Sequence, residues 1–123
     1  MRTFIQNSLN NLKDIECGEI ISDDIVEDNV TYFGYQLSKN YMNSDFEKNC
    51  TYRINLTGYV IRRIQPTENT TQIIDDSSEL IIDTLKALNF KCNSEDISIK
   101  NNIRKNKITG YVEYNEINKK LII

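Results

Sequence analysis

Residues 50–88 read CTYRINLTGYVIRRIQPTENTTQIIDDSSELIIDTLKAL, and the two parts of this segment have different hydrophobic periods. In its first part, Tyr52, Ile54 and Leu56 alternate with polar residues. This two-residue period predicts a strand from Cys50 to Ile64 with one buried and one wetter face. Pro66 stops the strand, because proline cannot donate a hydrogen bond to a neighbouring strand.

The second part of the stretch predicts an amphipathic helix from Thr70 to Leu88, with Thr67 or Asn69 available as its N-cap and Asn89 ending it. Its apolar stripe consists of Ile74, Ile81, Leu85 and Leu88, and the opposite face carries Asp75, Glu79, Asp83 and Lys86. A helix with one apolar face next to a half-buried strand indicates a helix lying on a sheet.

A second β-rich segment, Val30 to Met42, precedes this strand, so we expect the two to form a long antiparallel hairpin. We predict a bulge at Gly58 that swaps the faces of the second strand. Beyond Gly58 the alternation blurs through Ile61 and Ile64. We therefore expect this end of the hairpin to meet another protein surface rather than water.

The flanking segments complete an α+β domain. We expect a helix from Arg2 to Lys13, an acidic loop with one short strand from Asp14 to Asp28, a strand from Asp96 to Lys100, a basic turn, and a last strand from Ile108 to Ile117. The prediction is a single domain, residues 1–123, with a mostly antiparallel sheet and a long β-hairpin, covered by an N-terminal helix and a central amphipathic helix.

Composition excludes several kinds of chemistry. The chain has no histidine, so it cannot supply a Ser-His-Asp or Cys-His nucleophile or an imidazole zinc ligand. Its three cysteines, Cys17, Cys50 and Cys92, are widely spaced, and we interpret them as reduced thiols. The acidic residues Asp75, Glu79 and Asp83 could in principle hold a cation, but their place opposite an apolar stripe favours ordinary solvated carboxylates. We expect no enzymatic activity, no cofactor and no metal site.

Net charge and hydropathy limit the classes of partner that we expect. With 15 basic and 18 acidic residues, the formal charge of −3 argues against specific nucleic-acid binding. The sequence has no stretch of about 20 apolar residues and no signal-peptide run at its start, so we expect neither a membrane partner nor secretion, and we place the chain in a cytoplasm. Its 19 Ile, 16 Asn and 10 Lys are the bias expected of an AT-rich genome, that of a low-GC bacterium or its phage.

Opposite charges gather in different parts of the chain and give candidate interface residues. The region from Asp14 to Asp28 is acidic and has no basic residue. The basic clusters are Arg53, Arg62 and Arg63, and Arg104, Lys105 and Lys107. Either they form a solvated strand edge, or they complement the acidic region of a neighbouring copy. Tyrosines on the hairpin and the apolar end of the chain would add contact area. The candidate interface residues are Asp23, Asp24, Glu27, Asp28, Tyr59, Arg62, Arg63, Arg104, Lys105, Lys107, Leu121, Ile122 and Ile123.

The layout resembles the tail terminator proteins of long-tailed phages and phage-tail-like bacteriocins. The segments that carry the resemblance are the N-terminal helix, the acidic connection, the hairpin strand TYRINLTGYVI (residues 51–61), the amphipathic helix from Asp75 to Leu88 and the closing strand ITGYVEY (residues 108–114).

The resemblance implies a subunit of a six-membered ring on the head-proximal end of the tail tube, where the ring ends polymerisation and offers a joining surface. It implies as partners other copies of the chain, the tail tube protein, and a sheath or head connector protein. The protein would belong to a virion or a phage-tail-like particle assembled in the bacterial host cytoplasm. Two alternatives stay open: another neck or head–tail joining protein, and a small cytoplasmic protein-binding module.

Overall fold

The computed structural model describes residues 2–19, 26–44, 50–115 and 120–122, with side chains described in these ranges except at 41–44, 50–51, 96–98, 115 and 120–122. Asp23, Asp24 and Ile123 therefore lie outside the described residues. The elements are α1 (Arg2–Asn10), β1 (Ile15–Gly18), β2 (Thr31–Ser44), β3 (Cys50–Arg63), α2 (Thr70–Ala87), β4 (Lys91–Lys100), β5 (Ile103–Asn115) and β6 (Lys120–Ile122).

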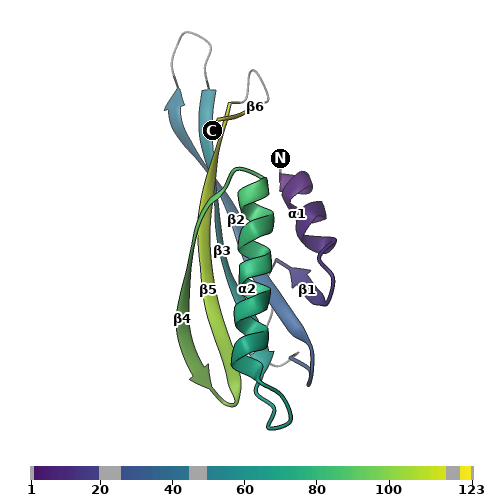
Figure 1. Ribbon diagram of the computed structural model, residues 1–123. Coiled ribbons are helices and arrows are strands. Elements are labelled where there is room, and N and C mark those ends of the chain that lie inside the picture. The colour runs from purple at the N-terminus through teal and green to yellow at the C-terminus, as the bar shows by residue number, and fades with distance from the viewer. Residues whose placement is uncertain (1, 20–25, 45–49, 116–119, 123) are drawn as a thin grey trace.

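The strands form a single six-stranded sheet with α1 and α2 on one of its faces (Figure 1). The strand order is β1-β2-β3-β5-β4, and β6 pairs with the end of β5. Only the β1–β2 pairing is parallel among the described strands. The predicted α+β class, the long hairpin and the two covering helices are thus confirmed.

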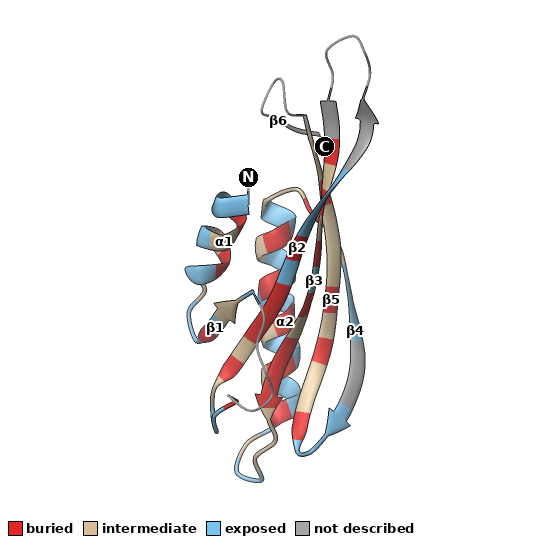
Figure 2. Cartoon of the chain, turned by 180° about the vertical axis from the view of Figure 1, so that it is seen from behind, coloured by how far each residue is buried: buried red, intermediate tan, exposed pale blue. Residues whose placement is uncertain are grey.

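The main core lies between the helices and the sheet (Figure 2). On β3, the helix-facing side chains Tyr52, Ile54, Leu56 and Val60 are all buried, as the alternation predicted. On α2, Ile74, Ile81 and Leu85 are completely buried, while Asp75, Glu79 and Asp83 are exposed. Each fully buried aliphatic side chain contributes about 1.5–3 kcal/mol, so this helix–sheet contact is a main source of stability.

The ends of α2 are set by two asparagines. At the start, the side-chain oxygen of Asn69 accepts a hydrogen bond from the backbone N–H of Gln72 at 3.2 Å. At the end, Asn89 adopts a left-handed conformation with φ of 68°, and the Phe90 N–H returns to the Leu85 carbonyl at 3.0 Å. Such a left-handed residue after a helix satisfies carbonyls that would otherwise have no partner.

The prediction of a basic turn at Arg104, Lys105 and Lys107 is wrong. These residues belong to β5, and the turn is formed instead by Asn101 and Asn102, with φ of 55° and 61°. Lys100 pairs with Ile103 across it, so β4 and β5 are joined by a two-residue hairpin loop that requires positive φ at both positions. β5 therefore begins at Ile103, five residues before its expected start at Ile108. β4 ends at Lys100 as expected, but it begins at Lys91, five residues before its expected start at Asp96.

The predicted bulge at Gly58 is also wrong. Gly58 pairs in regular register with Tyr35 on one side and Ile108 on the other, and the irregularity in the hairpin lies between Tyr41 and Asn43. A Cβ at Gly58 would lie 2.6 Å from Cε1 of Phe33 and 2.9 Å from Cβ of Tyr35. Glycine is therefore needed at this position because the space is filled by neighbouring side chains.

Candidate functional site

Several candidate interface residues lie on the face of the sheet that carries no helix. We call this surface the open face. By register, it is formed in β3 by Arg53, Asn55, Thr57, Tyr59, Ile61 and Arg63, and in β5 by Ile103, Lys105, Lys107, Thr109, Tyr111 and Glu113. Small polar side chains occupy its middle, and charged or aromatic ones its two ends.

One end of the open face is covered by the chain itself. Val26, Ile61 and Ile103 are each at most 4% exposed and form a small second core, with Tyr32 and Tyr59 packed against it. Val26 belongs to the acidic region from Asp14 to Asp28, for which the sequence predicts a loop with one short strand; β1 is that strand. The expectation that Ile61 and Ile64 mark a surface for another protein is thus corrected for Ile61, because Val26 of the same chain covers it.

Arg63 fastens the acidic region to the sheet. Its Nη2 donates to the carbonyl of Val26 at 3.0 Å, and its Nε lies 3.3 Å from Oδ1 of Asp28. The Glu27 N–H donates to the hydroxyl of Tyr32 at 3.3 Å. Arg63 and Asp28, which the sequence suggested for contacts between copies, are therefore paired with each other within one subunit.

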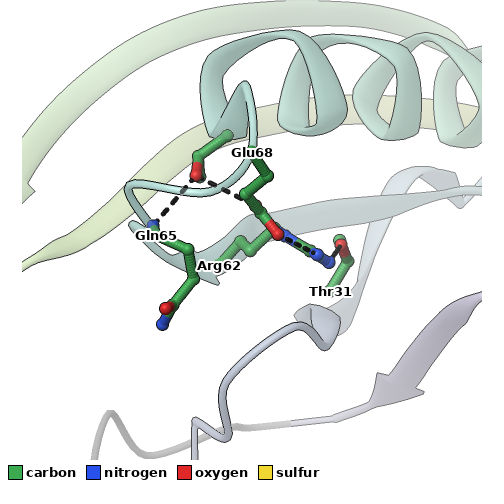
Figure 3. A network of polar contacts seen from close by, with 5 residues as sticks. Thr31, Arg62, Gln65 and Glu68 are labelled. Carbon is green, nitrogen blue, oxygen red and sulfur yellow. Dashed lines mark hydrogen bonds and ion pairs between the residues drawn. The ribbon is translucent and has the colours of Figure 1, made fainter.

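Arg62 points to the helix side and forms a closed network (Figure 3). Its Nε and Nη2 donate to the two carboxylate oxygens of Glu68, both at 2.8 Å, and its Nη1 donates to the hydroxyl of Thr31 at 2.7 Å. Thr70 donates to Glu68 at 2.9 Å and accepts from the Gln65 N–H at 3.2 Å. The network ties the end of β3 to the start of α2.

Electrostatics in this network follow from its hydrogen bonds. The bidentate bond to Glu68 raises the pKa of Arg62, and the bond from Arg62, supported by Thr70, lowers the pKa of Glu68. Arg62 is only 8% exposed, so it stabilises the subunit rather than offering its charge to a partner.

Two shallow hollows lie side by side on the open face and share Thr57. One, of about 380 Å³, lies over β3, β5 and β4; the other, of about 410 Å³, lies over β2, β3 and β5. The first is lined by Asn55, Thr57, Lys91, Asn93, Thr109 and Tyr111, and the second by Glu19, Gln36, Thr57, Tyr59, Ile61 and Lys105, each with neighbouring backbone. The first hollow is mainly polar, whereas Tyr59 and Ile61 make the second more apolar. Open hollows of this kind suit contact with a protein surface better than enclosure of a small molecule.

Tyr111 is the centre of a cationic cluster at the first hollow. The guanidinium carbon of Arg53 lies 4.1 Å from its ring centroid, and Nζ of Lys91 lies 5.8 Å from it. Arg53 also pairs with Glu113 at 3.1 Å. Tyr111, Lys91 and Glu113 are not among the candidate interface residues, although a two-residue period in the closing strand puts Tyr111 and Glu113 on one face.

The remaining candidate residues are distributed as follows. Glu27 is exposed. Lys105 and Lys107 are half-buried on the open face. The register directs Arg104 to the helix side of the sheet, so it is separated from the two lysines. Leu121 and Ile122 belong to β6, where they pair with Tyr114 and Glu113. The apolar end of the chain is thus part of the sheet as far as Ile122.

The described side chains show little reactive chemistry. Burial, reinforced by Glu16, raises the pKa of the Cys17 thiol to about 11, and burial also raises that of Cys92. A protonated thiol is a poor nucleophile. No group of three cysteine, aspartate or glutamate side chains gathers within metal-binding reach in the part of the chain that the structure describes.

Over the described residues, neither helix is long and apolar enough to span a bilayer.

Comparison with protein-family models, with curated proteins and with solved structures gives no match to this chain. The function is therefore argued from the residues described above.

Proposed function

We propose that the chain is a structural assembly protein of the tail-terminator kind: six copies form a ring that caps the head-proximal end of a phage or phage-like tail tube. The ring ends polymerisation of the tube and offers the surface to which a head connector or sheath protein joins. The protein acts by binding and has no catalytic step.

The observation that carries this proposal is the segregation of charge across the sheet. Exposed acids lie on the β1–β2 side, at Glu16, Glu19, Glu27 and Asp28, where Lys39 of β2 is an exposed lysine and Arg2 pairs with Glu19 at 2.8 Å. Lysines lie on the β4–β5 side, at Lys91, Lys100, Lys105 and Lys107, where Glu95 and Glu113 are the acids among the described side chains.

The arginines between these sides do not blur the segregation. Arg53 pairs with Glu113, Arg62 with Glu68 and Arg63 with Asp28. These strand arginines are thus balanced inside the subunit. Because Asp28 and Glu19 are likewise paired, with Arg63 and Arg2, the negative character of the β1–β2 side comes mainly from Glu16 and Glu27. The lysines give the β4–β5 side its positive character.

A subunit with acids on one side and lysines on the other is suited to head-to-tail association. In a cyclic ring each copy presents two different patches to its two neighbours, whereas a two-fold contact brings identical patches together. Charge complementarity mainly steers encounter and register. The hollows of the open face and tyrosines such as Tyr59 and Tyr111 supply contact area for the ring and for the tail tube protein.

The proposal is tested by assembling tails from a gene cluster that lacks this chain. We expect tubes of abnormal or uncontrolled length, or tails that do not join heads, and we expect the intact chain to restore normal tails. Tails of normal length that join heads without any ring at their upper end would refute the proposal. Normal tube length with failed joining would indicate the head–tail joining alternative.

Charge-reversed variants connect the result to the sheet. Glu16→Lys combined with Glu27→Lys, or Lys107→Glu, should fail to restore tail length, because each reverses one of the two charged sides. Glu79→Lys is the matched control: Glu79 is exposed, as Glu16 and Glu27 are, but lies on the outer face of α2. If the control fails as badly as the other variants, the sheet is not the assembly surface.

A further inference from the structure

Strand β4 is an outer edge of the sheet, and its first half is regular and exposed (Figure 1). Residues 91–95 pair in continuous register with β5, from Lys91 opposite Tyr111 to Glu95 opposite Lys107. Lys91, Asn93 and Glu95 are exposed on the open face. Among the described residues no strand lies outside this segment, so its outward backbone groups are available for pairing.

The two edges of the sheet differ in whether other groups of the chain occupy their outward backbone atoms. On the opposite edge, beyond the residues of β2 that pair with β1, Nη2 of Arg2 donates to the Leu37 carbonyl at 2.8 Å and so occupies a backbone acceptor. On β4 the register shifts between Asp96 and Ser98. A bulge bends an edge strand and ends regular pairing, so residues 91–95 form a short segment with a defined end.

We propose that the first half of β4 is a self-association surface, through which two copies of the chain pair antiparallel about a two-fold axis at Asn93. In this arrangement Lys91 of each copy lies opposite Glu95 of the other, and Cys92 lies opposite Ser94. The two sheets become one continuous sheet with both open faces on the same side.

Charge selects this register from the few that are possible. Both open faces can share one side only if open-face residues pair with open-face residues, so the axis must pass through a residue and not between two. An axis at Glu95 would oppose two glutamates, and an axis at Cys92 would leave Lys91 opposite Asn93. Only the axis at Asn93 places both lysines opposite both glutamates, and opposite charges in directly facing positions stabilise a strand pair.

This self-association needs no other protein, and the proposal is independent of whether the chain also forms a ring. A two-fold contact is isologous: both copies use the same surface, so each pair of facing residues occurs twice. It is therefore a separate contact from the head-to-tail one, and it covers an edge that would otherwise be open to indiscriminate pairing.

The first test measures self-association of the full chain by analytical ultracentrifugation over a concentration series. We expect a reversible dimer whose dissociation constant rises about tenfold or more in Lys91→Glu, because each interface then opposes two pairs of glutamates. The double variant K91E/E95K exchanges the charges and should restore the parent value. A monomer at every concentration, or a dimer indifferent to Lys91→Glu, overturns the proposal.

The second test uses geometry. In a background with Cys17, Cys50 and Cys92 replaced by serine, Asn93→Cys places two thiols across the axis, within the roughly 4.4–6.8 Å between Cα atoms that a disulfide needs. Glu95→Cys is the matched control, since residues 95 of the two copies would be about 13 Å apart along the strands. Rapid oxidation of the first variant to a covalent dimer is expected. Equal cross-linking of both variants, or of neither, contradicts the register, and circular dichroism of each variant verifies that it is folded.

Discussion

Replacing Gly58 with alanine would place a methyl group against Phe33 and Tyr35 in the main core. The new carbon would lie 2.6 and 2.8 Å from two ring carbons of Phe33 and 2.9 Å from Cβ of Tyr35. Carbon atoms in contact prefer separations of about 3.5–4.0 Å. Phe33 is completely buried and stacks on Tyr35 with 5.3 Å between the ring centroids, so the ring cannot yield without disturbing its neighbour.

Overpacking of this kind costs typically 1–3 kcal/mol. For a domain of this size, a loss of about 2 kcal/mol lowers the melting temperature by roughly 5–10 °C. Thermal and urea unfolding, followed by far-ultraviolet circular dichroism, measures the change. The double variant Gly58→Ala/Phe33→Leu should lose less than the sum of the two single changes, because the smaller side chain relieves the contact.

Gly18→Ala is the matched control, since a Cβ at Gly18 has no atom within 4 Å. Its free energy of unfolding should change by no more than about 0.5 kcal/mol. If Gly58→Ala and Gly18→Ala melt at the same temperature, the close contact at Gly58 is relieved at no cost and the packing argument fails.

Three further predictions concern other parts of the molecule. Ile81→Asp should prevent stable folding by burying a charge in the main core, whereas Glu79→Gln should change the free energy of unfolding by about 0.5 kcal/mol or less; similar melting temperatures would contradict the orientation of α2. Because the pKa of Glu68 is lowered in the fold, its contribution is present above the ordinary glutamate value and is lost as pH falls through the lowered one. Between about pH 7 and pH 3 the parent should therefore lose more stability than Glu68→Gln, and equal losses would show that the Arg62 pair is not the cause. With a pKa of about 11, Cys17 should react with iodoacetamide at about pH 8 far more slowly in the folded protein than in urea, and comparable rates would contradict its burial.

The sequence predicts those elements whose periodicity is produced by the main core. The helix from Thr70 and the strand around Leu56 each bury one continuous face, so their side-chain pattern records the fold directly. β4 has no such pattern, since Lys91, Asn93, Ser94 and Glu95 are all exposed, and its first half was missed. The Asn101–Asn102 turn was missed because asparagine is frequent throughout this chain.

Parts of the candidate site depend on contacts that no local pattern contains. Val26 covers Ile61 and Ile103 from a distant part of the sequence, and Arg62 meets Glu68 around the turn at Pro66. Both contacts involve residues, Ile61 and Arg62, for which the sequence predicts an interface with another protein. The charge of Arg62 and Arg63 was visible in the sequence, but their intramolecular partners became apparent only in three dimensions.

Asparagine and glycine occupy different kinds of position in this fold. The described non-glycine residues with positive φ are Asp14, Asn29, Asn89, Asn101 and Asn102, whereas no glycine has positive φ. Asparagine codons are rich in A and T and glycine codons are rich in G, so mutation pressure towards AT can replace glycine in turns, where the asparagine side chain tolerates a left-handed backbone. It cannot do so at Gly58, where any side chain collides with Phe33. A related gene with balanced base composition should therefore encode glycine at several of these turn positions while retaining it at position 58.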